Sequence, residues 1–166
     1  HGSISLTCSE KFLKRNQNRT LAQNYAAQME AVKLYKSHGV GVSRASLMAA
    51  FGCNFEGDIS PKHVVHMVGQ AMEIAKANDV VLKTMSLADT MAWATPMHIR
   101  RTVGAVRDAY PDLELALHLH DTRGLGIANA YAGLEMGVRI FDAAVAGLGG
   151  CPFASHKGAA GNVCTE

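Results

Sequence analysis

Strand-like and helix-like segments alternate along the whole chain, and no other feature of the sequence constrains the fold as strongly. A strand-like segment returns roughly every 30 to 40 residues. Strands separated by helices in this way predict parallel βαβ units. The expected strands are 3–9, 80–90 and 113–121, together with one in 41–52, which runs into a loop, and one in 138–150, which includes its exit loop. The expected helices are 20–39, 61–78, 96–110 and 123–136.

Helix caps support these boundaries. Thr20 and Gln23 have the spacing of a capping box. The pairs Ser60-Pro61 and Thr95-Pro96 each place a hydroxyl at the N-cap and a proline at the first helical position.

Two α/β architectures fit the alternation: an open doubly wound sheet and a (β/α)8 barrel. A barrel takes about 250 residues, whereas this chain has 166 residues and five expected strands. The chain begins at His1 without Met and stops at Glu166 in mid-pattern. We therefore expect residues 1–166 to be a piece of a longer protein.

Composition excludes several classes of protein. With 48% hydrophobic and 18% charged residues the chain is expected to fold. Its net charge of +2 gives no electrostatic case for binding nucleic acid or an anionic membrane. No apolar run approaches the roughly 18 residues of a membrane span. The four cysteines are widely spaced and form no CxxC pair, so we expect a reducing, cytoplasmic setting.

Two histidines end the fourth expected strand, in "LALHLHD". Residues two apart in a strand share a face, so His118 and His120 point the same way. A lone histidine there is more often a hydrogen-bonded core residue. Two on one face, followed directly by Asp121, favour a metal site instead.

Asp89 and Arg44 are further candidates, each with an ordinary alternative. Asp89 ends its strand in a place equivalent to that of His120, but the position also suits a turn or N-cap aspartate. Arg44 fits a counter-charge to a substrate carboxylate, and equally an edge arginine paired with a nearby loop.

The glycine-rich stretch "AGLGGCPFASHKGAAGN" follows the last expected strand. Its glycines let the backbone come close to a ligand, and Pro152 stiffens the position after Cys151. We expect the thiol of Cys151 to be exposed on this loop and suited to proton transfer. Asn162 ends the loop and offers an amide oxygen.

These motifs together resemble the 3-hydroxy-3-methylglutaryl-CoA lyase family. The matching stretches are "FGCNFEGDISP", "SLADT…TP", "HLHDTRGLGIANAYAGLEMGV", "AGLGGCP" and "GN", in that order over essentially the whole chain. The HxHD motif is shared with isopropylmalate synthases and biotin-dependent carboxyltransferase domains, whereas the GGCP loop favours the lyases. The resemblance implies an incomplete TIM (β/α)8 barrel holding about strands 4 to 8.

The resemblance also implies site residues. His118, His120 and Asn162 would ligate a divalent metal, Mg²⁺ or Mn²⁺. Cys151 would be the catalytic loop thiol, and His118 would also transfer a proton. Asp89 would face the substrate. The family's Arg-Asp pair, whose aspartate is another metal ligand, and a nearby Glu have no counterpart here.

Three positions depart from the family pattern. Ala88 stands where the family has Gly, and Asn54 where it commonly has Pro. The loop between Cys151 and Asn162 is about two residues longer than usual, with His156-Lys157 as the extra pair. Because a longer loop could admit a different acyl group, the identity of the substrate's acyl group stays open.

The implied reaction is a retro-Claisen cleavage of a 3-hydroxy-3-methylglutaryl-CoA-like thioester to acetyl-CoA and a keto acid, acetoacetate, as in leucine catabolism. One alternative is a condensing or carboxyl-transferring enzyme of the same superfamily, such as an isopropylmalate or citramalate synthase. Another is a catalytically incomplete fragment, since the chain by itself is expected to be inactive. The acyl-CoA thioester is the expected partner, and a homodimer stays open.

Overall fold

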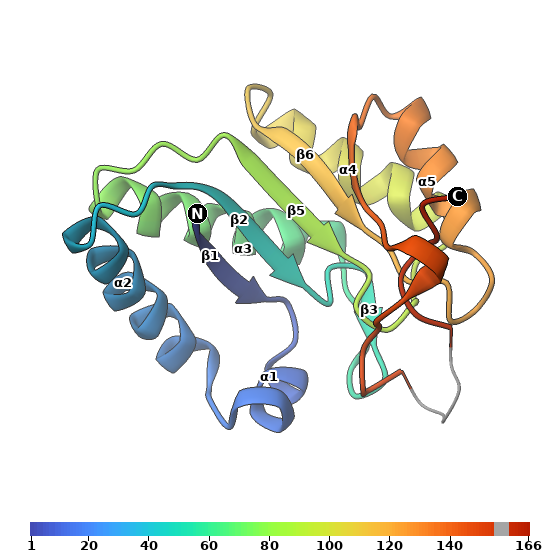
Figure 1. Ribbon diagram of the computed structural model, residues 1–166, viewed down its shortest axis with the longest axis horizontal. Helices are drawn as coiled ribbons and strands as arrows, with labels where there is room; N and C mark the ends of the chain where they lie inside the picture. Colours follow the sequence, from blue (N-terminus) through green and yellow to red (C-terminus); the bar gives the residue numbers. More distant parts are fainter. Residues whose placement is uncertain (155–159) are drawn as a thin grey trace.

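The computed structural model describes residues 1–154 and 160–166, and five of its strands form a parallel sheet (Figure 1). The strands lie side by side in chain order, β1-β2-β5-β6-β7, and each neighbouring pair is parallel. The predicted α/β class with alternating strands and helices is confirmed. The strands are β1 Gly2–Thr7, β2 Val42–Met48, β5 Thr84–Ala88, β6 Glu114–His118 and β7 Ile140–Asp142.

The predicted caps start the connecting helices. Thr20 and Gln23 form both hydrogen bonds of a capping box, and the hydroxyls of Ser60 and Thr95 accept from backbone amides of the turns that they open. In the described parts of the chain, no helix has the length and apolarity to cross a membrane. The helices are α1 Glu10–Gln17, α2 Leu21–Ser37, α3 Pro61–Ala77, α4 Pro96–Ala109 and α5 Gly126–Glu135.

The order of the strands separates the two architectures that the alternation left open. A doubly wound sheet reverses its strand order at a switch point, and no reversal occurs among the described strands. Right-handed crossovers that all step in one direction place their helices on one face of the sheet. In agreement, α2 packs on α3, α3 on α4, and α4 on α5. This order is that of a barrel segment.

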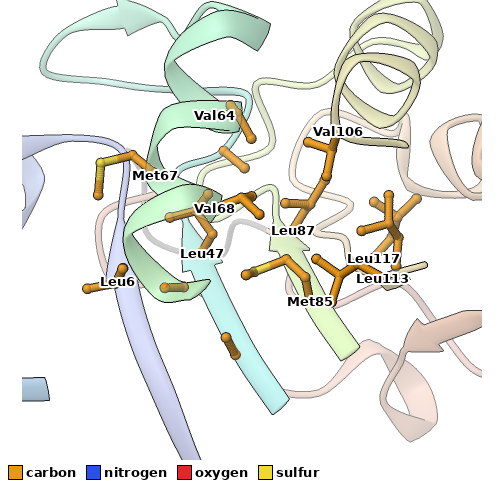
Figure 2. Close-up of a cluster of buried hydrophobic side chains, with 14 of the residues drawn as sticks. Leu6, Leu47, Val64, Met67, Val68, Met85, Leu87, Val106, Leu113 and Leu117 are labelled. Atoms are coloured by element: carbon orange, nitrogen blue, oxygen red, sulfur yellow. The ribbon is translucent and has the colours of Figure 1, made fainter. Parts of the chain in front are cut away.

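The helix-facing side of the sheet forms the hydrophobic core (Figure 2). Leu47, Leu87 and Leu117 stand on adjacent strands in matching register and are at most 1% exposed. They pack under helices α3 and α4, whose Val68 and Val106 are fully buried. The alternate strand residues point to the opposite face, which therefore carries the polar side chains.

Two elements lie outside the sequence expectations. Helix α1 was missed because, apart from Phe12 and Leu13, its residues are exposed and polar. A short antiparallel hairpin, β3 Gly52–Cys53 with β4 Gly57–Asp58, lies in the segment expected to be a loop. The segment 138–150, expected to hold the last strand and its exit loop, has a strand of three residues and then a 3-10 segment, η1 Val145–Gly147, with positive φ at Ala146 and Gly147.

Candidate active site

A cavity of about 370 Å³ opens at the carboxyl ends of the strands. His118 ends β6, and His120 lies two residues beyond it. The Cys151 loop and Asn162 form the opposite wall, and Phe12 of α1 adds an apolar side. The structure thus brings His118, His120, Cys151 and Asn162 to one place, where enzymes with parallel α/β folds place their sites.

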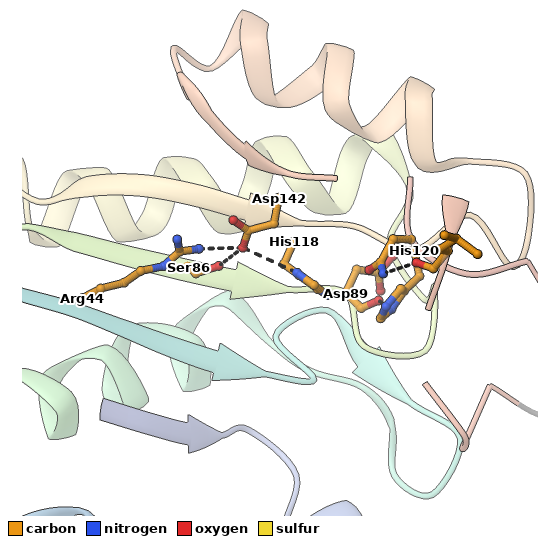
Figure 3. A network of polar contacts seen from close by, with 8 residues as sticks. Arg44, Ser86, Asp89, His118, His120 and Asp142 are labelled. Atoms are coloured by element: carbon orange, nitrogen blue, oxygen red, sulfur yellow. Dashed lines mark hydrogen bonds and ion pairs between the residues drawn. The ribbon is translucent and has the colours of Figure 1, made fainter. Parts of the chain in front are cut away.

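The two imidazole rings lie on the same face, as their spacing predicts. Their centroids are 5.1 Å apart and their planes are nearly perpendicular. Nδ1 of His120 lies 3.0 Å from the Asp89 carbonyl oxygen (Figure 3). Burial and the neighbouring His118 lower the pKa of His120. A neutral ring that donates from Nδ1 keeps the Nε2 lone pair for a ligand.

Asn162 presents a buried oxygen beside these rings. The backbone of residues 161–163 pairs with that of the His120 segment, because Asp121 N donates to Gly161 O and Val163 N to Leu119 O, each at 2.9 Å. Nδ2 of Asn162 donates to the Leu148 carbonyl at 2.7 Å. The Asn162 side chain interacts with the His120 ring, yet its Oδ1 has no hydrogen-bond partner among the described residues.

An unpaired buried amide oxygen costs about 1–3 kcal/mol unless a ligand or water satisfies it. Two imidazoles and this oxygen therefore fit a divalent cation that accepts nitrogen and oxygen ligands. Among the described residues, no group of three or more His, Cys, Asp or Glu side chains could hold a metal. The candidate ligand set of the described residues is therefore two imidazoles and one amide oxygen.

Cys151 lines the same cavity and is half-buried rather than exposed as expected. Its loop packs against Phe12, whose ring meets that of Phe153 edge-on at 5.6 Å. Burial raises the pKa of the Cys151 thiol more than the Phe153 amide lowers it. The group is therefore a thiol at neutral pH, and it suits donating a proton. The expected extra pair, His156-Lys157, lies outside the described residues.

Asp89 does not face the cavity as expected. Its side chain is fully buried, and its carboxylate accepts hydrogen bonds from the backbone amides of Trp93 and Ala94 at 2.7–3.1 Å. Burial raises its pKa to about 6, although these amides and Arg123 lower it. Asp89 is therefore placed as a turn aspartate, the alternative that the sequence left open. Its backbone carbonyl lies against Nδ1 of His120.

Arg44 forms an ion pair within the sheet. Its Nη2 lies 2.5 Å from Oδ2 of Asp142 on β7 (Figure 3). Strands β2 and β7 are three places apart in the sheet, which is about 14 Å in a flat sheet. The long Arg44 side chain therefore runs across β5 and β6 on the polar face of the sheet to meet Asp142. In the described parts of the chain Arg44 thus pairs with a strand carboxylate and not with a loop, and its role as a counter-charge to a substrate carboxylate stays a prediction.

Sequence reasoning missed Asp142. It is the one acidic residue in the segment "VRIFDAAV", and an acidic residue at the end of an apolar strand was the available signal. Burial would raise the pKa of Asp142, but the hydrogen bond and charge of Arg44 outweigh burial and lower it. Asp142 is therefore an ionised acceptor on the same face as His118.

The structure places Ala88 and Asn54, the two described residues that depart from the family pattern. Ala88 lines the cavity beside His118, its register partner on β6. Asn54 donates to the Phe153 carbonyl at 2.9 Å and accepts from Trp93 Nε1 at 2.8 Å. A proline at this position could form neither of these side-chain bonds.

Known proteins resemble the chain in sequence and in fold. It is 36% identical over its whole length to an (R)-citramalyl-CoA lyase of Chloroflexus aurantiacus, spanning 50% of that protein. It is 35% identical over 99% of its length to the human cytoplasmic 3-hydroxy-3-methylglutaryl-CoA lyase, spanning 42% of that protein. The chain thus spans about half the length of the curated relatives it matches.

Solved structures give the same result. The crystal structure of hydroxymethylglutaryl-CoA lyase from Pseudomonas aeruginosa superposes with a TM-score of 0.85 at 34% identity, over 98% of this chain and 51% of that one. An HMG-CoA lyase from Acinetobacter baumannii, in complex with coenzyme A and 3-methylmalate, gives 0.83 at 37% identity, over 98% and 50%. The sheet therefore matches half of an HMG-CoA lyase. The HMGL-like family profile matches residues 3–166, and the chain belongs to that family.

Proposed function

We propose that the full-length protein containing this chain is a metal-dependent carbon–carbon lyase acting on a 3-hydroxyacyl-CoA thioester. The observation that carries the proposal is the convergence of two imidazoles, an unpaired buried amide oxygen and a protonated thiol on one cavity. The fold would be the (β/α)8 barrel, of which this chain supplies about half.

His118, His120 and Asn162 would hold the metal, Mg²⁺ or Mn²⁺. When bound, the cation would polarise the substrate's hydroxyl and carbonyl oxygens. The ligand set needs at least one further oxygen, and a carboxylate from the rest of the barrel would supply it.

The chain's own residues then divide the proton transfers. Cleavage removes the proton from the 3-hydroxyl group, breaks the bond between C2 and C3, and moves the electron pair onto the thioester as an enolate. Nε2 of His118 is the ring nitrogen available to take the hydroxyl proton, since Nδ1 lies against Asp142. One lone pair cannot bind a cation and take a proton at once, so in this step His120, Asn162 and the further oxygen ligand would hold the cation. The thiol of Cys151 would protonate C2, which yields acetyl-CoA.

The names of two relatives support two different acyl groups for the substrate. The human relative named above acts on 3-hydroxy-3-methylglutaryl-CoA by its name, and the Chloroflexus relative on (R)-citramalyl-CoA. We propose the first as substrate and the second as the alternative. The keto acid product separates them, because the first gives acetoacetate and the second pyruvate. The lyase names of these relatives favour cleavage over the condensing and carboxyl-transferring alternatives.

The test is a product assay on the full-length protein with Mg²⁺ or Mn²⁺. Each thioester is supplied without a second acyl acceptor, and acetyl-CoA and the keto acid are measured together. We expect both products in equal amounts from one thioester, and none from the His120→Ala variant. Free CoA released from acetyl-CoA and a keto acid, with no cleavage of either thioester, would show a condensing enzyme instead.

A further inference from the structure

We propose that Asp142 is a positioning residue for His118. Its carboxylate accepts a hydrogen bond from Nδ1–H of His118 and so fixes the tautomer and orientation of the ring. Arg44 and Ser86 hold the carboxylate in place. This inference rests on the proposed function only in that His118 serves the cavity. The positioning is a separate property of the sheet and is measurable without turnover.

One oxygen carries the arrangement. Oδ2 of Asp142 lies 3.5 Å from His118 Nδ1, 2.5 Å from Arg44 Nη2 and 3.3 Å from Ser86 Oγ (Figure 3). His118 and Asp142 are register partners on β6 and β7, so their side chains leave the sheet side by side. Arg44 and Ser86 reach the same oxygen from β2 and β5.

The carboxylate is therefore fixed from the side opposite the histidine. Arg44 supplies a charged hydrogen bond, which is stronger than a neutral one, and Ser86 supplies a second donor. With two donors on Oδ2, the carboxylate cannot turn away from His118 without losing both contacts. The pair is also half-buried, with side chains 40% and 32% exposed, so solvent screens it less than a fully exposed pair.

His120 also has its Nδ1 next to a protein oxygen, in this case a backbone carbonyl. Its Nδ1 faces the Asp89 carbonyl, and that of His118 faces the Asp142 carboxylate. In both rings Nδ1 is the nitrogen nearest a protein oxygen, at 3.0 Å in a hydrogen bond of His120 and at 3.5 Å in an ion-pair contact of His118. Which nitrogen of an imidazole carries the proton is set by the hydrogen bond that the other makes. A carboxylate partner also makes a metal-binding or basic histidine a stronger base.

The chain offers a matched control. Arg100 and Glu135 form an ion pair of the same 2.5 Å length between helices α4 and α5, with side chains 45% and 41% exposed. Neither residue lines the cavity. Removing this pair tests what the loss of an ion pair does to the fold, without touching either histidine.

The experiment compares Asp142→Ala, Asp142→Asn and Glu135→Gln in the full-length protein. The His118 tautomer is read from ¹⁵N–¹H spectra of histidine-labelled protein, assigned with His118→Gln, and the Mn²⁺ dissociation constant is measured by electron paramagnetic resonance. We expect Asp142→Ala to lose the Nδ1–H tautomer of His118 and to weaken Mn²⁺ binding about 10–100-fold. Asp142→Asn keeps an acceptor oxygen and a similar shape, so its loss should be smaller. Glu135→Gln should change neither quantity.

An Nδ1–H tautomer and an Mn²⁺ affinity that stay as in the wild type in both Asp142 variants would overturn the proposal. Equal weakening in Glu135→Gln would also overturn it, since the effect would then be general destabilisation. A tautomer shift in a protein that cleaves neither thioester would support the positioning and refute the lyase reaction. Full lyase activity without a tautomer shift in the Asp142 variants would support the lyase reaction and refute the positioning.

Discussion

Gly161 is the position at which a single methyl group should disturb the candidate site most directly. A Cβ added there would lie 2.0 Å from the Gly149 carbonyl oxygen and 2.5 Å from the Gly147 carbonyl oxygen. Both neighbours are backbone atoms, so no side chain can rotate to make room. To restore normal contact the Gly161 segment must move by about 1 Å or more, since the packed interior leaves few voids.

That displacement pulls on two backbone hydrogen bonds, Asp121 N to Gly161 O and Val163 N to Leu119 O. Each is worth about 0.5–1.5 kcal/mol net, so Gly161→Ala should cost on the order of 1–3 kcal/mol. Because Asn162 lies between the two bonds, its Oδ1 moves with them. We therefore expect weaker metal binding as well as lower stability.

The assay is the Mn²⁺ dissociation constant and the melting temperature of the full-length Gly161→Ala variant. Gly41→Ala is the matched control, because its added Cβ would meet nothing within 4 Å. We expect Gly161→Ala to lower Tm by a few degrees and to weaken Mn²⁺ binding at least about 10-fold. Mn²⁺ affinity and Tm equal to those of Gly41→Ala would refute the reasoning.

Three further predictions concern the cavity residues His120 and Cys151 and the accessibility of the other cysteines. His120→Ala should abolish metal retention in elemental analysis, whereas Leu119→Ala, which removes a fully buried side chain, should retain metal and cost about 2–5 kcal/mol in denaturant unfolding. Cys151→Ala should lower kcat by orders of magnitude with metal content unchanged, as expected when a group acts mainly in the transition state, whereas near-normal turnover would exclude a proton-transfer role. In the native protein a thiol reagent should label exposed Cys164 at once and Cys8 only on unfolding, because burial raises the pKa of the Cys8 thiol; rapid labelling of Cys8 would contradict the packing around β1.

Much of the local structure could be predicted from the sequence, because it depends on neighbouring residues. The capping pairs at Thr20, Ser60 and Thr95 work over three or four residues, and each starts its helix where expected. The two-residue spacing of His118 and His120 dictates a shared face in any strand. Helix α1 shows the limit of such reasoning, since its mostly polar surface has no apolar stripe to detect.

The candidate site residues were predicted from motifs, but their arrangement depends on contacts between distant parts of the chain. Asp89 and Asp142 both end strands, and nothing local distinguishes them. The amides of Trp93 and Ala94 turn Asp89 away from the cavity, and Arg44, 98 residues away in sequence, holds Asp142 toward His118.

The sequence by itself determined where the five strands of the sheet and four of the five described helices lie, and which strand residues share a face. Only the tertiary structure decided the strand order, the pairing of Arg44 with Asp142, and the unpaired oxygen of Asn162. The physical reason is range: caps and side-chain alternation act within one turn or one strand. Strand order and polar partners depend instead on which distant segments pack together, and one sequence segment does not contain that information.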